Sequence, residues 1–85
     1  MMKVSILAET KDIYSSERVK CINIPSVSGE ICVYPDHMSI ITLMAPGTIR
    51  VTYVENEIDK VLPIEISEGI FSFKDNMATC LVTQK

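Results

Sequence analysis

Every apolar run in this chain has the length of a β-strand, and this feature most constrains the fold. Isoleucine and valine dominate the runs, and turn-forming residues separate them. No window of useful length shows the period of an amphipathic helix. The pattern therefore predicts a chain built from β-strands alone. We expect strands over residues 3–8, 19–24, 31–34, 40–44, 47–54, 62–66, 70–73 and 77–82.

The segment over residues 47–54 shows most clearly which side of a strand faces the core. Ile49, Val51 and Tyr53 fall on one face, and the residues between them are polar. In the next predicted strand, Pro63 has no N–H to give to a neighbour. We therefore expect that strand at a sheet edge, or Pro63 at a position that requires no hydrogen bond from its nitrogen. Each of these strands is thus expected to bury one face.

Four polar segments predict turns between the strands, at residues 9–12, 26–29, 55–57 and 74–76. The last two are short enough for tight hairpins, so the strands in the second half of the chain should pair antiparallel. Short strands at this spacing indicate a sandwich or a barrel.

Size and charge exclude several classes of protein. The chain has 85 residues, which indicates a single domain over residues 1–85. Its net charge is −3, with acids and bases mixed along the chain, which argues against nucleic-acid binding. No apolar run approaches the ~18 residues of a membrane span. The N-terminal stretch is also too short and too quickly charged for a signal peptide. We therefore expect no direct membrane insertion, and any membrane association through a partner.

The three cysteines, Cys21, Cys32 and Cys80, do not predict a disulfide framework or a zinc site. Their number is odd, and no CxxC spacing occurs. All three lie in apolar, strand-like runs. We expect them to be reduced, with Cys21 and Cys80 buried and Cys32 closer to a turn.

The sequence contains no set of residues that predicts catalysis, a metal site or a bound cofactor. His37 is the only histidine, and its neighbour Asp36 should point away from it in extended chain. A pairing of His37 with Cys80 stays open. Glu65 and Glu68 could form a carboxylate pair, but separate exposed charges are the simpler interpretation. No glycine-rich phosphate loop is present.

Residues 29–47 contain two apolar runs joined by a Pro-Asp-His loop. Pro35 fixes its own φ at about −65°, and Asp36 favours turn geometry. Pro46-Gly47 closes the second run. An exposed loop of this kind on a rigid β scaffold suits contact with a partner better than chemistry.

Within this segment, Gly29-Glu30, Pro35, His37, Thr42 and Pro46-Gly47 follow one another in a recognisable register. The arrangement resembles the N-terminal domain of the epsilon subunit of F-type ATP synthases. That family has Gly-Glu, an apolar pair, Pro-x-His, a small or apolar triplet, Thr and Pro-Gly at these positions.

The resemblance covers nearly the whole chain in order. Ser67-Glu68-Gly69-Ile70 is similar to the family's Ser-Gly-Gly-apolar signature, and Asn76-x-x-Thr79-x-Leu81 to its last strand. Asp36, Cys32 and Glu68 depart from the family, which usually has glycine at each position. Because aspartate tolerates positive φ better than most residues, we expect Asp36 to keep the family's turn.

The resemblance implies an all-β fold, a flattened sandwich of two antiparallel sheets with about ten short strands. It also implies a non-catalytic central-stalk subunit of a proton-translocating ATP synthase, which couples the c-subunit ring to the gamma subunit during ATP synthesis. By position, Glu30 belongs to the ring-facing turn, and His37 and Thr42 to the gamma-facing surface. Asp36 and Met38 flank His37 on the same loop and complete the predicted partner-binding set.

The implied location is peripheral, on the cytoplasmic face of the bacterial inner membrane or its mitochondrial or chloroplast equivalent. Family members usually continue into a C-terminal pair of helices that carries inhibition and, in some members, ATP binding. Nothing in this sequence matches that segment, so neither property is carried over. Two other classes stay open: a free-standing, monomeric β-sandwich binding module, and a small enzyme with an unrecognised site.

Overall fold

In the part of the chain that the structure describes, the fold consists of seven β-strands. A computed structural model of the protein describes residues 1–9 and 11–84. The strands are β1 (Met2–Ala8), β2 (Lys11–Ser26), β3 (Gly29–Val33), β4 (Ile40–Met44), β5 (Gly47–Glu55), β6 (Ile58–Lys74) and β7 (Met77–Gln84). These residues form no helix that could cross a membrane. The predicted all-β class is confirmed.

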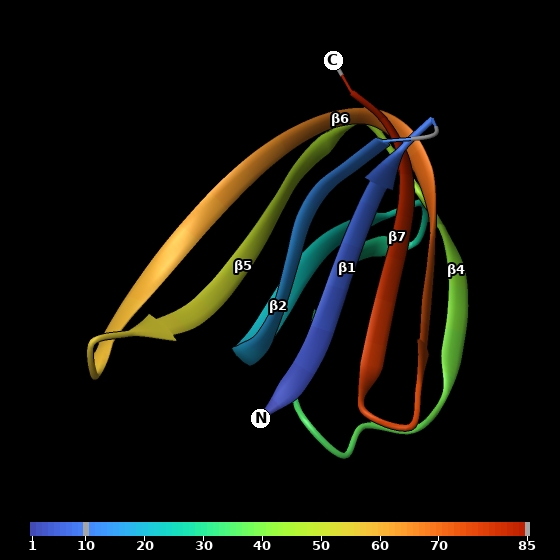
Figure 1. Ribbon diagram of the computed structural model, residues 1–85. Coiled ribbons are helices and arrows are strands. Elements are labelled where there is room, and N and C mark those ends of the chain that lie inside the picture. The colour runs from blue at the N-terminus through green and yellow to red at the C-terminus, as the bar shows by residue number, and fades with distance from the viewer. Residues whose placement is uncertain (10, 85) are drawn as a thin grey trace.

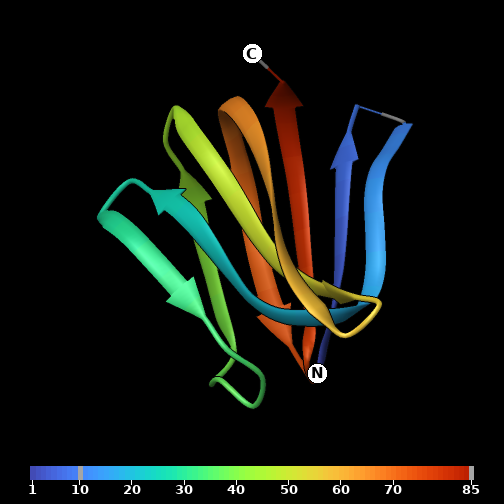
Figure 2. The same ribbon diagram turned by 90° about the vertical axis from the view of Figure 1, so that its left-hand side faces the viewer.

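Two long strands, β2 and β6, bend across the molecule and give it two layers (Figure 1, Figure 2). In the first layer, β4, the second half of β6, β7 and β1 lie side by side in that order. In the second layer the order is β3, the second half of β2, β5 and the first half of β6. Ser26 of β2 also pairs with Met44 of β4, so the two layers form one continuous hydrogen-bonded sheet.

A bulge in β6 changes which side chains face the core. Before the bulge, Ile64 and Ile66 face inward, and after it Phe71 and Phe73 do so. The register shift lies between Ile66 and Glu68, where one extra residue is inserted. The inward positions are therefore even-numbered before the bulge and odd-numbered after it. A similar register shift occurs near the middle of β2.

The prediction of about ten short strands is corrected by this bending, because the structure has seven strands, two of them long. The predicted strands at 62–66 and 70–73 are one strand, β6, which continues through its bulge from one layer to the other. One pair also departs from the predicted antiparallel sheets, because β1 and β7 run parallel. All other pairs are antiparallel, so the predicted sandwich class holds.

The first half of β2 was not predicted as a strand, since residues 11–18 are mostly polar. This segment is extended because it pairs with β1, opposite Ala8, Leu7, Ile6, Ser5 and Val4. The pairing shows that tertiary contacts override local composition here. The predicted turn at 9–12 is wrong at Lys11 and Asp12, which belong to β2, and its position 10 lies outside the described residues. Glu9 beside it has a φ of 58°.

The other predicted turns are confirmed. Asn56 and Glu57 join β5 to β6, and Asp75 and Asn76 join β6 to β7. All four have positive φ, between 52° and 62°, as the central residues of a type I′ hairpin turn require. The predicted edge position of Pro63 is also confirmed, because the first half of β6 pairs only with β5.

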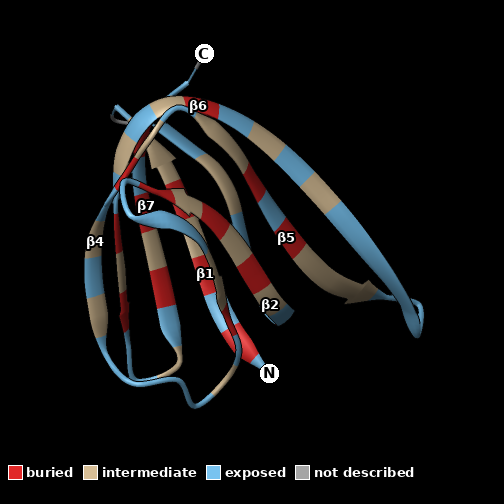
Figure 3. Cartoon of the chain, turned by 180° about the vertical axis from the view of Figure 1, so that it is seen from behind, coloured by how far each residue is buried: buried red, intermediate tan, exposed pale blue. Residues whose placement is uncertain are grey.

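The core lies between the two layers and takes inward side chains from every strand (Figure 3). Its largest fully buried members are Phe71, Phe73 and Met2, followed by the isoleucines Ile6, Ile22, Ile24, Ile49 and Ile66. Burying one such side chain contributes about 1.5–3 kcal/mol to stability. Buried residues alternate with more accessible ones from Met2 to Leu7 of β1 and from Met77 to Thr83 of β7. This pattern holds the sheet register, because a slip by one residue would turn the apolar side chains outward.

Gly69 occupies a tight place just after the β6 bulge. A Cβ there would lie 2.6 Å from the Leu81 carbonyl oxygen, 2.9 Å from Met44 Cε and 3.0 Å from Val82 Cγ1. Because two of these atoms belong to core side chains and one to backbone, a side chain at Gly69 must displace packed structure.

We predict that Gly69→Ala lowers the free energy of unfolding by about 1–3 kcal/mol, the usual range for overpacking. Urea denaturation measures this change. Ser72→Ala is the matched control, since Ser72 lies on the outer face of the same strand opposite Ile41. Equal stabilities for the two variants would contradict the tight packing at Gly69.

Candidate functional site

A row of apolar side chains crosses the outer face of the first layer over four neighbouring strands, from β4 to β1. The sheet register sets Leu43 of β4 opposite Ile70 of β6, Ile70 opposite Leu81 of β7, and Leu81 opposite Leu7 of β1. Leu43, Ile70 and Leu81 are 58%, 45% and 49% exposed, and Leu7 is half-buried. We call these four residues the outer apolar row.

Two more exposed apolar side chains extend this surface. Ile41, 79% exposed, is the next outward residue on β4. Val27, in the turn between β2 and β3, donates its N–H to the Leu43 carbonyl oxygen at 3.1 Å. A groove of about 630 Å³ runs over the row, with Gly69 in its lining. A contiguous exposed apolar surface of this kind is typical of a protein interaction site.

The bulge in β6 is the reason that Ile70 belongs to this surface. Without the extra residue, Ile70 would share a face with Ile66, which is fully buried. With it, Ile70 points outward and Phe71 takes the inward position. The row therefore depends on the same irregularity that completes the core.

The predicted Pro-Asp-His loop, residues 34–39 between β3 and β4, lies at the end of the molecule that holds the N-terminus (Figure 1). We call it the contact loop. It is tied to the β6–β7 turn through Asp36 and Asn76. The Asp36 N–H donates to Asn76 Oδ1, and Asn76 Nδ2 donates to Asp36 Oδ1 at 2.9 Å. Asp36 has a φ of 67°, as predicted for a residue at a usual glycine position. The loop is therefore held in one shape by side-chain hydrogen bonds.

His37 is exposed on this loop and has three nearby contacts. Its N–H donates to the Tyr34 carbonyl oxygen at 3.2 Å, and its Nδ1 lies 2.7 Å from the Met38 carbonyl oxygen. Its ring meets Phe73 edge-on, with centroids 6.2 Å apart. Met38 beside it is 78% exposed. His37 and Met38 thus present a flat ring and an apolar side chain to solvent on a fixed loop.

The other two predicted partner-binding residues lie elsewhere. Glu30 is exposed on β3 and accepts a hydrogen bond from Asn23 Nδ2 at 3.3 Å. Thr42 is half-buried on the core side of β4, opposite the buried Phe71. The structure thus groups Asp36, His37 and Met38 on one loop and places Glu30 and Thr42 apart from them.

Sequence reasoning missed the outer apolar row. Alternation along β4 could have indicated Ile41 and Leu43 as one outward pair. Ile70 and Leu81 carried no such signal, since only the bulge and the strand order of the first layer bring them beside Leu43. The row is a product of tertiary structure.

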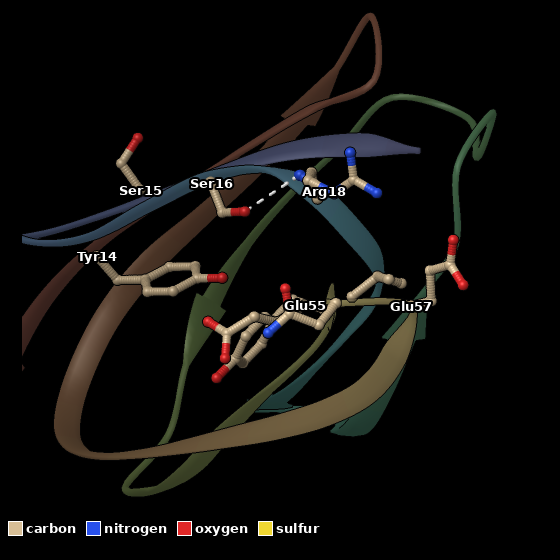
Figure 4. Close-up of a pocket in the computed structure, with 9 residues that line it drawn as sticks. Tyr14, Ser15, Ser16, Arg18, Glu55 and Glu57 are labelled. Atoms are coloured by element: carbon tan, nitrogen blue, oxygen red, sulfur yellow. Dashed lines mark hydrogen bonds between the residues drawn. The ribbon is translucent and has the colours of Figure 1, made fainter.

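A second, polar hollow of about 580 Å³ lies between β2 and the β5–β6 turn (Figure 4). Tyr14, Arg18, Tyr53, Glu55 and Glu57 are among its lining residues. The Tyr14 and Tyr53 rings are tilted at 55°, and the Tyr14 hydroxyl is buried without a hydrogen-bond partner in the described structure. Lys60 already pairs with Glu55 at 2.7 Å. The described lining of this hollow holds hydroxyl and carboxylate groups, but no thiol or imidazole.

Burial raises the pKa of Cys80 to about 12, the opposite of the lowered pKa of a catalytic thiol. His37 is exposed while Cys80 is fully buried. The pairing of His37 with Cys80 left open above is therefore not a catalytic one. Among the described residues no three potential ligands gather to hold a metal ion.

The cysteines differ in exposure. Cys80 is buried as predicted, but Cys21 is half-buried, so the prediction of a buried Cys21 is wrong. It lies on the outer face of the second layer, because the bulge in β2 turns Ile22 inward instead. Cys32 is also half-buried, and its thiol lies 3.6 Å from Asn23 Oδ1. Burial is the main cause that raises the pKa of Cys32.

These observations define a small β-sandwich with an exposed apolar face and a fixed contact loop. Residues 1–84 match the family described as ATP synthase, delta/epsilon chain, β-sandwich domain. The chain belongs to this family.

Curated relatives agree with the assignment. The chain is 33% identical over 81 residues to a protein of Neisseria meningitidis serogroup C named ATP synthase epsilon chain, and the match covers 95% of this chain and 56% of that one. It is 35% identical over 77 residues to the ATP synthase epsilon chain of Ruthia magnifica, covering 89% and 51%. The chain thus spans about half the length of the curated relatives it matches.

Solved structures show the same fold. A chain in the Euglena gracilis mitochondrial ATP synthase matches with a TM-score of 0.83 at 23% identity, over 95% of this chain and 49% of that one. A chain in the central stalk and c-ring structure of the Tetrahymena thermophila mitochondrial ATP synthase matches with a TM-score of 0.78 at 14% identity, over 98% and 63%.

We predict that Asn76→Gly frees the contact loop, because it removes both hydrogen bonds to Asp36 while still permitting a positive φ. Two such bonds contribute about 1–3 kcal/mol together. The amide of Asp36 should then exchange with solvent about 5- to 150-fold faster, since about 1.4 kcal/mol corresponds to tenfold. Hydrogen exchange followed by NMR measures this rate. Asp75→Gly is the control in the same turn. Equal exchange rates in both variants would show that the two hydrogen bonds between Asp36 and Asn76 do not hold the loop.

We predict that Cys21 and Cys32 react with a thiol reagent in the native protein and that Cys80 does not. At pH 8 a thiol with a pKa of about 12 is almost wholly protonated, and Cys80 is also shielded by the core. Timed labelling followed by mass spectrometry of peptides measures each rate. Labelling of Cys80 as fast as Cys21, without unfolding, would contradict its burial.

Proposed function

We propose that this chain is a non-catalytic central-stalk component of a proton-translocating ATP synthase. In this proposal its β-sandwich docks on the gamma subunit through the outer apolar row and contacts the c-subunit ring near Glu30. The family membership supports the assembly, and the exposed outer apolar row is the observation that supports docking.

The row suits a lasting contact more than a passing one. Leu43, Ile70 and Leu81 are held on rigid strands that pair directly with one another, so little side-chain or backbone freedom is lost on docking. Their exposed area is apolar, and covering it with a partner removes it from water. Mechanically, a close-packed body with one fixed face can transmit rotation from ring to gamma with little compliance.

The contact loop also supports docking on the gamma subunit. Asp36, His37 and Met38 lie beyond the end of β3. The two hydrogen bonds between Asp36 and Asn76 hold this loop in place. His37 offers flat area and a free ring edge, and Met38 offers an adaptable apolar side chain. We propose that these residues extend the gamma contact. Thr42 then acts by packing behind Leu43, because its side chain lies on the core side of β4.

Glu30 is proposed to face polar loops of the ring. It lies on β3, the outermost strand of the second layer, and its carboxylate is exposed. A rim charge of this kind fixes register and speeds association more than it adds affinity. We further propose that residues 1–85 fold as one unit and are monomeric when isolated. The location would be peripheral, on the cytoplasmic face of the bacterial inner membrane or its organellar equivalent.

A free-standing binding module is the second candidate, since an exposed apolar face and a fixed loop suit any protein partner. The two candidates differ in what they bind. The stalk proposal requires tight binding to an isolated gamma subunit, whereas a free-standing module would not bind that subunit.

We predict that Ile70→Ser weakens binding to purified gamma subunit about thirtyfold, equivalent to about 2 kcal/mol. Isothermal titration measures the affinity, and a melting curve checks that the variant is folded. Val61→Ser is the matched control, because Val61 is 57% exposed and lies in the second layer, on the hairpin formed by β5 and the first half of β6, which we call the β5–β6 arm. His37→Ala should also weaken binding with little change in melting temperature.

The outcome distinguishes the two candidates. If the parent protein does not bind gamma at micromolar concentration, the stalk proposal fails. If the parent binds but Val61→Ser weakens binding and Ile70→Ser does not, the docking face has been assigned to the wrong layer.

A further inference from the structure

The groove over the outer apolar row has an acidic end. Glu68 at the β6 bulge and Glu9 just after β1 both line it, and both are exposed. No lysine or arginine belongs to its described lining. Apolar surface and negative charge therefore meet at one place, beside Leu81 and Ile70.

These two carboxylates have no ion-pair partner within the described chain. The ion pairs there are Lys20 with Asp59 and Lys60 with Glu55, all in β2, β5 or β6 on the side of the second layer. A partner that covers the outer apolar row must therefore cover or approach two carboxylates that pair with no described lysine or arginine. Desolvating such a charge is costly unless an opposite charge meets it.

The charge along this face is not uniform. At the other end Lys3 and Lys74 both lie opposite Met77, so they share its outer face. Four strand residues, about 13 Å, separate Lys3 from the level of Leu7. Asp75 in the adjoining turn makes that end mixed in charge, whereas the described lining of the groove near Glu9 and Glu68 includes carboxylates and no lysine or arginine. The charge of this face therefore changes along the strands, in a direction that crosses the row.

We propose that the partner on the outer apolar row presents apolar side chains to the groove and a lysine or arginine to Glu68, with Glu9 beside it. This inference rests on the proposed function and adds the chemistry of the partner's docking strip. The basic group would offset the desolvation of the carboxylates and fix the direction in which the partner lies. Such a pair acts mainly on association rate and register.

The test is the association rate with purified gamma subunit, measured by stopped flow at about 0.05 M and 0.5 M salt, where screening differs strongly. Glu68→Lys should slow association about tenfold at low salt, and the difference should fall below about twofold at high salt. Glu68→Gln should show a smaller effect of the same sign and guards against misfolding of the reversed variant. Glu65→Lys is the control, because Glu65 lies opposite Thr48 in the second layer.

The outcomes separate this inference from the docking proposal. If both Glu68 variants associate as fast as the parent, or if Glu65→Lys slows association equally, the basic docking strip is wrong. Loss of binding in Ile70→Ser alongside such a result would leave the docking face itself intact. If the parent does not bind gamma at all, both the docking face and the basic strip are wrong.

Discussion

Strand β6 exchanges its inward and outward faces at the bulge between Ile66 and Glu68, and the core and the outer face both depend on that exchange. Before the bulge the strand completes the second layer against β5, and after it the strand joins β4 to β7 in the first layer. The inserted residue places Phe71 in the core and Ile70 outside. Just after the bulge, Gly69 has no side chain at a position where the neighbouring atoms leave no room for a Cβ.

This constraint explains why a chain this small can have both a closed core and a flat apolar face. The buried core between the two layers includes no residue of the outer apolar row, so the row is not part of the packing that closes the sandwich. The row is then free to bind. The two hydrogen bonds between Asp36 and Asn76 add a second fixed element, since they tie the contact loop to the turn that leads from β6 into β7.

Local patterns predicted the all-β class, the two tight hairpin turns and the edge position of Pro63, because each depends on short-range chemistry. The turn at Asp36, with its positive φ, was expected from the family resemblance. Local patterns did not predict the strand over residues 11–18 or the burial of Cys21 correctly, since pairing with β1 and the bulge in β2 decide these. The outer apolar row was missed for the same reason: its four residues come from four strands and meet only through the register of the folded sheet.

The central claim is that the outer face of the first layer binds gamma, and methyl NMR tests it most directly. Ile41 and Ile70 lie on that face, whereas Ile58 and Val61 are exposed on the β5–β6 arm of the second layer. On titration with purified gamma subunit, the account predicts that the methyl signals of Ile41 and Ile70 shift or broaden while those of Ile58 and Val61 stay unchanged. Shifts at Ile58 and Val61 with Ile41 and Ile70 unchanged would contradict it.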